Sequence, residues 1–179
     1  IRTEITTQLL ADQGYAVHTT NEDGEEVTKV YKAKDFERKF FNEETNVAMC
    51  KAFLENGLFD PLAKELGVQL FGKSLVFCVS QSYAARITNI LNKLAFEKWP
   101  GQYGESDFAM QVTSLVQGAQ QMTINFANNL LSGKVKSPEG YDTCKTRVCV
   151  TVGMMTTGYD CQDILNLALM RPVFSPSEF

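Results

Sequence analysis

The pattern of apolar and polar positions changes character near residue 72. Before it, apolar residues either alternate with polar ones, as in residues 15–20 and 27–31, or recur at helical spacing, as in Val47, Cys50 and Leu54. After it, continuous apolar runs take turns with segments of helical spacing. We therefore predict a mainly helical lead-in with one hairpin, followed by an α/β domain wound on a mostly parallel sheet.

The second part contains four predicted strands, at residues 74–80, 108–114, 147–152 and 164–170. Continuous apolar runs of this length are typical of strands that are buried on both faces of a parallel sheet. Two longer helices are predicted between them, over about residues 81–98 and 117–131. This alternation of buried strand and amphipathic helix is the basis for the α/β prediction.

The first part combines turn and helix signals. Asn-Glu-Asp-Gly at residues 21–24 predicts the turn of a hairpin, whose strands are polar on one side and so are expected at a sheet edge. Asn42 is predicted to cap a helix. A short helix should begin at Pro61 and end at Gly67.

Charge divides the chain at the same place. Residues 1–72 hold thirteen acidic and eight basic side chains, whereas residues 73–179 hold eight and nine. We therefore place a domain boundary between an acidic lead-in, 1–72, and a second domain, 73–179. The formal net charge of −4 excludes a histone-like nucleic-acid binder, although a local basic groove remains compatible with it.

Cysteine usage and hydropathy bear on the compartment. No apolar run approaches the roughly 18 residues of a membrane span, so no membrane partner is expected. Cys50, Cys78 and Cys149 lie in apolar runs, where cysteine acts as a small buried hydrophobe. With a single histidine and no C-x-x-C pair, we expect no metal site and a reduced, cytoplasmic protein.

Residues 67–74, GVQLFGKS, match the letters of the phosphate-loop motif. That motif needs a strand before the loop and a helix after it, because loop amides and the helix N-terminus must converge on the phosphates. Here the order is reversed, since a helix is predicted to end at Gly67 and a strand to open at Ser74. The segment is therefore predicted to be a connector.

Ligands of parallel sheets bind beyond the carboxyl ends of the strands. The segment VGMMTTGYD after the third strand holds four candidates for phosphate or ribose binding: Thr156, Thr157, Gly158 and Asp160. An ordinary turn, with Asp160 capping a short helix at residues 161–163, is an equal alternative.

The loop after the first strand lies at the same edge if the strands are parallel. It contains Ser80 and Gln81, and the plainer role of Ser80 is to cap the following helix. Trp99 and Tyr103 stand near a Pro-Gly turn and are expected to pack locally instead of stacking on bases. A single histidine excludes the hydrolase triads.

Three stretches of the second part resemble a known family: GKSLVFCVSQSYAARI, TSLVQGAQQMTINF and VTVGMMTTGYDCQDILNLALMRPVFSPSEF. They resemble motif IV, the next strand-to-helix element, and motif V with its continuation, in the second RecA-like motor lobe of superfamily 2 helicases and translocases. The order T-T-G-Y-D, apolar strand, M-R-P-V and S-x-x-E-F is more specific. It resembles the R subunit of type I restriction-modification enzymes.

The resemblance covers residues 72–179 well, and residues 1–72 less closely resemble the acidic segment that joins the two lobes. It implies a RecA-like three-layer domain that works with ATP and Mg²⁺, double-stranded DNA, and methylation and specificity subunits. Residues implied at the nucleotide are Gly158 and Asp160. Residues implied near DNA are Ser80, Gln81, Thr156 and Thr157.

No catalytic residue is expected within this chain. The family's first lobe and its Q-x-x-G-R-x-x-R motif are not in the sequence, and phosphoryl transfer depends on those positioning groups. Because the chain starts at Ile1, we expect it to be a piece of a larger protein. Gln120 and Gln121 stand where the family often has an arginine. The alternatives are another superfamily 2 DNA or RNA helicase, or a non-catalytic α/β interaction module.

Overall fold

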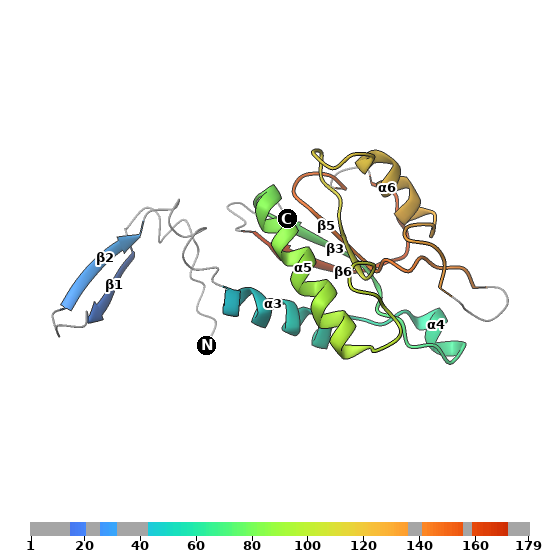
Figure 1. Cartoon of the computed structure of the whole chain (residues 1–179), viewed down its shortest axis with the longest axis horizontal. Helices are drawn as coiled ribbons and strands as arrows, with labels where there is room; N and C mark the ends of the chain where they lie inside the picture. Colours follow the sequence, from blue (N-terminus) through green and yellow to red (C-terminus); the bar gives the residue numbers. More distant parts are fainter. Residues whose placement is uncertain (1–14, 21–25, 32–42, 136–140, 156–158, 172–179) are drawn as a thin grey trace. The chain divides into compact units, whose positions relative to one another are not determined.

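The computed structural model describes residues 15–20, 26–31, 43–135, 141–155 and 159–171 (Figure 1). The chain divides into two compact units. One consists of residues 1–46 and 172–179, and the other of Val47–Arg171. The second unit therefore also contains residues 47–72, which the charge distribution assigns to the lead-in.

The described strands of the first unit form a hairpin. Strand β1 (Tyr15–Thr20) pairs antiparallel with β2 (Glu26–Tyr31). The predicted hairpin is thus confirmed, with β2 starting one residue earlier than expected. The two strands form a sheet of their own, and the four-stranded sheet does not include them. The predicted turn and the predicted cap Asn42 lie outside the described residues.

The second unit is built on a four-stranded sheet with the order β4-β5-β3-β6. All three strand pairs are parallel, which confirms the predicted α/β class. The strands are β3 (Lys73–Cys78), β4 (Ala109–Gln111), β5 (Val148–Thr151) and β6 (Ile164–Met170). β4 is shorter than the predicted strand because it pairs only with β5, from Ala109 to Gln111.

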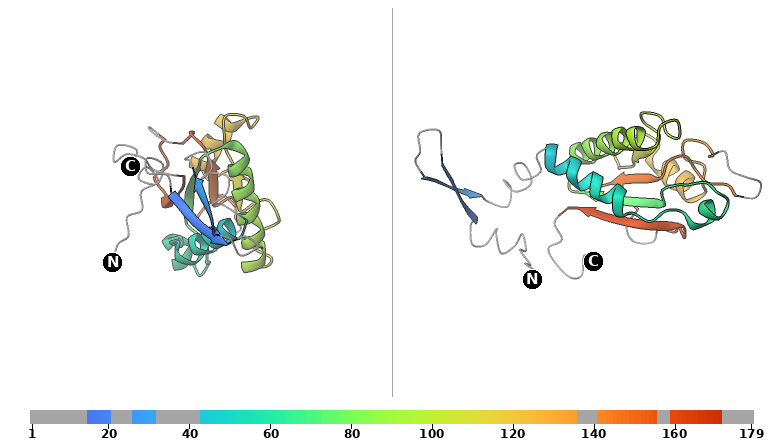
Figure 2. Two further views of the ribbon diagram at one scale, coloured as in Figure 1. Left: turned by 90° about the vertical axis from the view of Figure 1, so that its left-hand side faces the viewer. Right: turned by 90° about the horizontal axis from the view of Figure 1, so that it is seen from below.

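Helices cover both faces of the sheet (Figure 1 and Figure 2). Helix α5 (Gln81–Lys98) packs on β4, β5 and β3, and α3 (Glu43–Asn56) lies beside it. On the other face, Phe126 of α6 (Ala119–Ala127) shares a core cluster with Leu75 and Phe77 of β3. The result is a three-layer α/β arrangement, as expected for a RecA-like domain.

Helix ends follow the capping residues of the sequence. α5 has the predicted bounds, and its N-cap Ser80 accepts a hydrogen bond from the Tyr83 amide. The short helix α4 (Pro61–Glu65) starts as predicted, and Gly67 follows it at a φ of 76°. α6 is shorter than predicted because Gly118 and Asn129, with positive φ, interrupt the helix on either side.

Strand β6 has an open edge. Among the described strands it pairs with β3 alone, so the backbone on its other side has no strand partner there. The cluster beneath α6 takes in Leu169, yet Leu167 on the same face is 60% exposed. α6 therefore covers the central strands and leaves part of β6 open.

Six aromatic rings pack together beyond the amino ends of the strands: Phe53, Phe59, Phe71, Trp99, Tyr103 and Phe108. The Trp99 ring lies 5.6 Å from Phe108 and 5.8 Å from Tyr103, centroid to centroid. The predicted local packing of Trp99 and Tyr103 is confirmed. Aromatic pairs at such separations add to the stability gained from burial alone.

Gly72 allows a close approach between two chain segments. A Cβ atom on it would lie 2.6 Å from the backbone oxygen of Leu58 and 2.8 Å from Cδ1 of Leu165. Gly72→Ala should therefore lower the free energy of unfolding by about 1–3 kcal/mol, measured by urea denaturation. Gly153→Ala is the control, since its Cβ would meet nothing within 4 Å. Equal losses for the two variants would contradict the close approach.

Candidate functional site

The loops after β3 and β5 leave the sheet at the same edge, because the two strands are parallel neighbours with Phe77 paired to Thr151. Ser80 and Gln81 follow β3 directly and so lie at this carboxyl edge, where ligands of parallel sheets bind. Ser80 caps α5, as its plainer role predicts. Contact of either residue with DNA stays a prediction.

Two further polar side chains join this edge. The amide nitrogen of Gln111 donates to the Gln81 backbone oxygen at 3.1 Å and lies 3.3 Å from the Thr113 hydroxyl. Neither Gln111 nor Thr113 was predicted as a site residue. The one feature of the sequence that could have pointed to them is their position near the end of the second predicted strand. Thr113 is fully buried, so it supports Gln111 from inside and does not itself face a ligand. The part of the edge that is not fully buried thus carries the Ser80 hydroxyl and the Gln81 and Gln111 amides, groups that bind phosphate and sugar oxygens without carrying charge.

Arg171 supplies a cation at the same edge. It follows Met170, which pairs with Cys78 at the carboxyl end of β3. Its Nε is buried and has no hydrogen-bond partner among the described residues. A guanidinium is a group that commonly pairs with phosphate oxygens. The described edge thus combines hydroxyl and amide groups with one guanidinium, whose Nε is not open to solvent.

The segment between β5 and β6 is described only in part. Thr156, Thr157 and Gly158 lie outside the described residues. Asp160 is exposed and lies between Tyr159, which bonds to Thr123 of α6, and Asp163, which pairs with Lys73 on the amino side of the sheet. The described residues therefore do not bring it together with Ser80 and Gln81 at the carboxyl edge. Its nucleotide role stays a prediction.

The capped short helix that was the alternative for Asp160 is not formed. Residues 161–163 make a turn instead, closed by a hydrogen bond from the Ile164 amide to the Cys161 oxygen at 3.4 Å. β6 begins at Ile164, and strand pairing at once draws the chain into the sheet. Too few residues remain between Asp160 and the strand for a helical turn to propagate.

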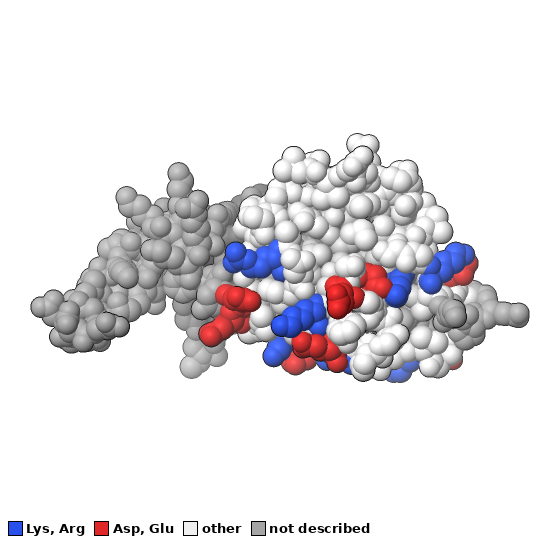
Figure 3. Space-filling model, in the orientation of Figure 1, with Lys and Arg blue, Asp and Glu red and all other residues white. Residues whose placement is uncertain are grey.

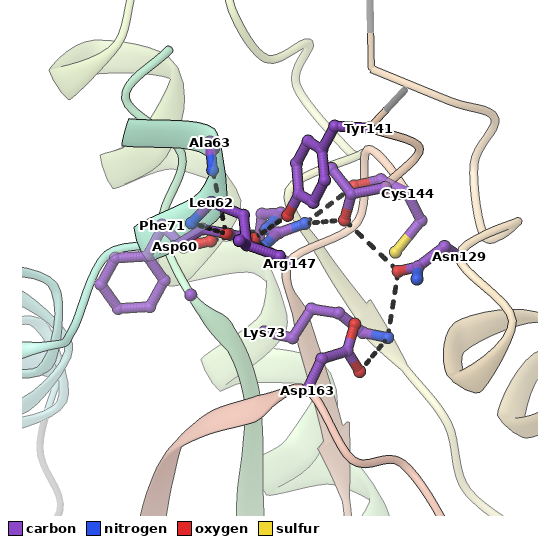
Figure 4. Close-up of polar contacts among 12 residues, drawn as sticks. Asp60, Leu62, Ala63, Phe71, Lys73, Asn129, Tyr141, Cys144, Arg147 and Asp163 are labelled. Atoms are coloured by element: carbon purple, nitrogen blue, oxygen red, sulfur yellow. Dashed lines mark hydrogen bonds and ion pairs between the residues drawn. The ribbon is translucent and has the colours of Figure 1, made fainter. Parts of the chain in front are cut away.

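Lys73, the lysine of the phosphate-loop letters, is buried at the start of β3 with 1% of its surface exposed. Its ammonium donates to the Phe126 oxygen at 2.6 Å. Figure 4 shows its two side-chain partners, Asn129 Oδ1 at 3.2 Å and Asp163 Oδ1 at 2.8 Å. An ammonium has three N–H groups, and all three are occupied. The predicted order of helix, connector and strand is confirmed, and Lys73 has no donor left for a phosphate.

A second buried cation, Arg147, lies nearby with none of its surface exposed (Figure 4). Its guanidinium contacts Asp60 at 3.0 Å, the Phe71 oxygen at 2.5 Å and the Thr143 hydroxyl at 2.5 Å. The Tyr141 hydroxyl donates to the same Asp60 carboxylate. Burial, followed by this bond to Asp60, raises the pKa of Tyr141 to about 12.

These two clusters connect the segments at the amino side of the sheet. Their cations are not available to bind a ligand or to take part in catalysis. Every cation in them is already paired inside the protein. Among the described residues, no three His, Cys, Asp or Glu side chains converge so that they could hold a metal ion. The structural role of both clusters was not predicted from the sequence.

The cysteines are also unsuited to nucleophilic chemistry. All five are free, and Cys50, Cys78 and Cys149 are buried as predicted. Burial raises the pKa of the Cys50 and Cys78 thiols to about 12, so both stay protonated at neutral pH. The carboxyl edge is left as the candidate binding site.

Comparison with known proteins adds no identification. No protein-family model matches the chain, and no curated protein matches it. In the part of the chain that the structure describes, no helix has both the length and the apolar character needed to cross a membrane. The function has to be argued from the residues and the fold.

Arg147→Met should be strongly destabilising because it leaves the Asp60 carboxylate largely buried without its cation. We expect the free energy of unfolding to fall by about 3–5 kcal/mol in urea denaturation. Lys134→Met is the matched control, since Lys134 pairs with Asp142 in the open, at 50% and 67% side-chain exposure. The control should lose less than about 1 kcal/mol. A similar loss in both variants would rule out the special role of Arg147.

The pair of Lys73 and Asp163 should make stability depend on pH. Burial alone would raise the pKa of Asp163, but hydrogen bonds from Lys73 and Cys161 and the charge of Lys73 outweigh it and hold that pKa below its ordinary value. A carboxyl whose pKa is lower in the folded chain stabilises the fold above its unfolded pKa. This contribution is lost as the pH falls through the folded pKa.

Wild type should therefore be more stable than Asp163→Asn at neutral pH, and the difference should shrink as the pH is lowered through the acid range. Urea denaturation at a series of pH values measures it. A difference that stays constant down to the most acidic pH would show that Asp163 does not act as a paired carboxylate.

Proposed function

We propose that this chain is part of the second motor lobe of an ATP-dependent double-stranded DNA translocase, the motor subunit of a type I restriction-modification enzyme. ATP would close this lobe on a first lobe, and hydrolysis would drive DNA past the complex. Methylation and specificity subunits would be its other partners. The proposal rests on the motif resemblance of residues 72–179 together with the edge geometry below.

One structural observation supports the proposal more than the others do. The central strands β3 and β5 are parallel neighbours, so the motif IV-like loop and the chain that enters the motif V-like segment leave the sheet at one edge. In open parallel sheets this edge is where nucleotides and substrates bind. A sheet in which these loops emerged at opposite edges would have argued against a shared site.

The residues divide into two proposed roles. On the nucleotide side, Gly158 and Asp160 would face ATP and its Mg²⁺, which are held mainly by the first lobe. Arg171, which follows Met170 at the carboxyl end of β6, would bring its guanidinium to a phosphate oxygen. On the DNA side, the proposed contacts are Ser80, Gln81, Thr156 and Thr157. ATP hydrolysis supplies the free energy for movement, and this chain binds and positions.

A second candidate, a non-catalytic interaction module, is favoured by the distribution of charge. Residues 108–133 form a run of twenty-six residues without a single Asp, Glu, Lys or Arg. Figure 3 shows the region of α6 free of charged side chains, which gather lower on the same face. Leu115 and Ile124 are 80% and 51% exposed there. Cores of protein–protein interfaces are likewise poor in charged residues.

The test uses the protein expressed from the complete coding sequence that contains this chain. We expect ATP hydrolysis that depends on double-stranded DNA, and a loss of about tenfold or more in its rate in Asp160→Ala. Gln162→Ala is the matched control, because Gln162 is exposed in the same segment. The 179-residue chain alone should not hydrolyse ATP.

Two results would overturn the proposal. Absence of DNA-stimulated hydrolysis in the complete protein would leave the interaction module as the better explanation. Turnover by the chain alone that is lost in Lys73→Ala would instead show that residues 67–74 bind nucleotide after all.

A further inference from the structure

The segment that leads into β6 is held by two of its side chains. The Tyr159 hydroxyl donates to the Thr123 oxygen of α6 at 2.8 Å, and Asp163 accepts from Lys73 at 2.8 Å. Cys161 lies between them, its thiol 3.1 Å from the Asp163 carboxylate. Tyr159 and Asp163 thus tie the segment to α6 and to Lys73, while Asp160 is exposed between these two anchors.

Lys73 is the centre of this anchoring. Its buried ammonium contacts the Phe126 oxygen near the end of α6. It also contacts the Asn129 side chain and the Asp163 carboxylate before β6 (Figure 4). Asp163 is the one charged partner of Lys73 among the described residues. A buried ammonium needs that opposite charge, because hydrogen bonds to neutral groups replace only part of the hydration it gives up.

We propose that Lys73 is a positioning residue. Acting through Asp163, it fixes residues 159–163 against α6 and so holds the carboxylate of Asp160 in one place. The value of that placement for nucleotide binding rests on the proposed function, whereas the anchoring itself does not.

The proposal gives the phosphate-loop lysine a role that the motif does not describe. Lys73 touches no ligand, yet it joins the start of β3, the end of α6 and the approach to β6 at one atom. A ligand that displaces Asp160 would also affect α6. Tyr159 bonds to Thr123 of α6, and Asp163 pairs with Lys73, which in turn bonds to the Phe126 oxygen of α6. α6 and the Asp160 segment should therefore open together.

The experiment measures local opening in the full 179-residue chain. Hydrogen exchange of the amides of residues 159–163 is followed by mass spectrometry. Alkylation of Cys161 would be a poor reporter, because its thiol contacts Asp163 and both substitutions would change its reactivity directly. In Asp163→Asn and Lys73→Met we expect the exchange rate of these amides to rise about tenfold or more, while exchange in α5 stays as in wild type.

Two controls separate anchoring from general destabilisation. Asp142→Asn breaks the exposed pair with Lys134 and should leave residues 159–163 unchanged. Asp163→Glu keeps the charge and should restore most of the protection lost in Asp163→Asn. Should Lys73→Met fail to fold, Asp163→Asn alone decides the outcome.

The proposal is overturned if Asp163→Asn folds and exchanges at residues 159–163 like wild type. A uniform rise over the whole domain would overturn it as well, because it would show a stability effect without local anchoring. The proposed function has a separate readout, DNA-stimulated ATP hydrolysis by the complete protein. Local opening in the variants together with no such hydrolysis in wild type would support the anchoring and reject the motor.

Discussion

The buried guanidinium of Arg147 is the constraint on which this fold depends. Removing such a cation from water is costly unless every donor finds a partner. Those partners come from three separate stretches: Asp60 before α4, the Phe71 oxygen before β3, and Thr143 with the Cys144 oxygen before β5. Lys73 is a second buried cation nearby, and its donors are likewise paired within the protein, one of them with Asp163. Because both cations secure the amino side of the sheet, the carboxyl edge is free of structural ion pairs among the described residues.

The sequence predicted an element best where the residues that determine its ends are its neighbours in the chain. α5 has its predicted ends because Ser80 caps a long amphipathic stretch. α6 was predicted too long, although Gly118 and Asn129, residue types that favour a left-handed backbone, stand at its two ends. The length of β4 could not be predicted, because the ladder with β5 sets it.

The same distinction applies to the candidate site. Element order alone was enough to reject Lys73 as a nucleotide ligand. Its actual partners could not be predicted, because Asn129 and Asp163 are 56 and 90 positions away. Gln111 and Thr113 are an intermediate case. The edge on which they lie follows from strand direction, but the hydrogen bonds of Gln111 to Gln81 and to Thr113 depend on side-chain geometry. Ionic networks and side-chain pairings belong to the tertiary structure, and one sequence contains no direct record of them.

The open edge of β6 should affect how the molecule associates with other chains. Its sequence, ILNLALM, carries no charge and no proline, the residues with which natural edge strands discourage pairing with other chains. A bulge near Leu165 at its start is the one such device present. Among the described residues, the outer backbone of β6 has no strand partner, so a strand from a neighbouring molecule could pair with it beside the exposed Leu167. We therefore expect protein concentration, more than temperature, to determine how long a preparation of this chain stays monodisperse.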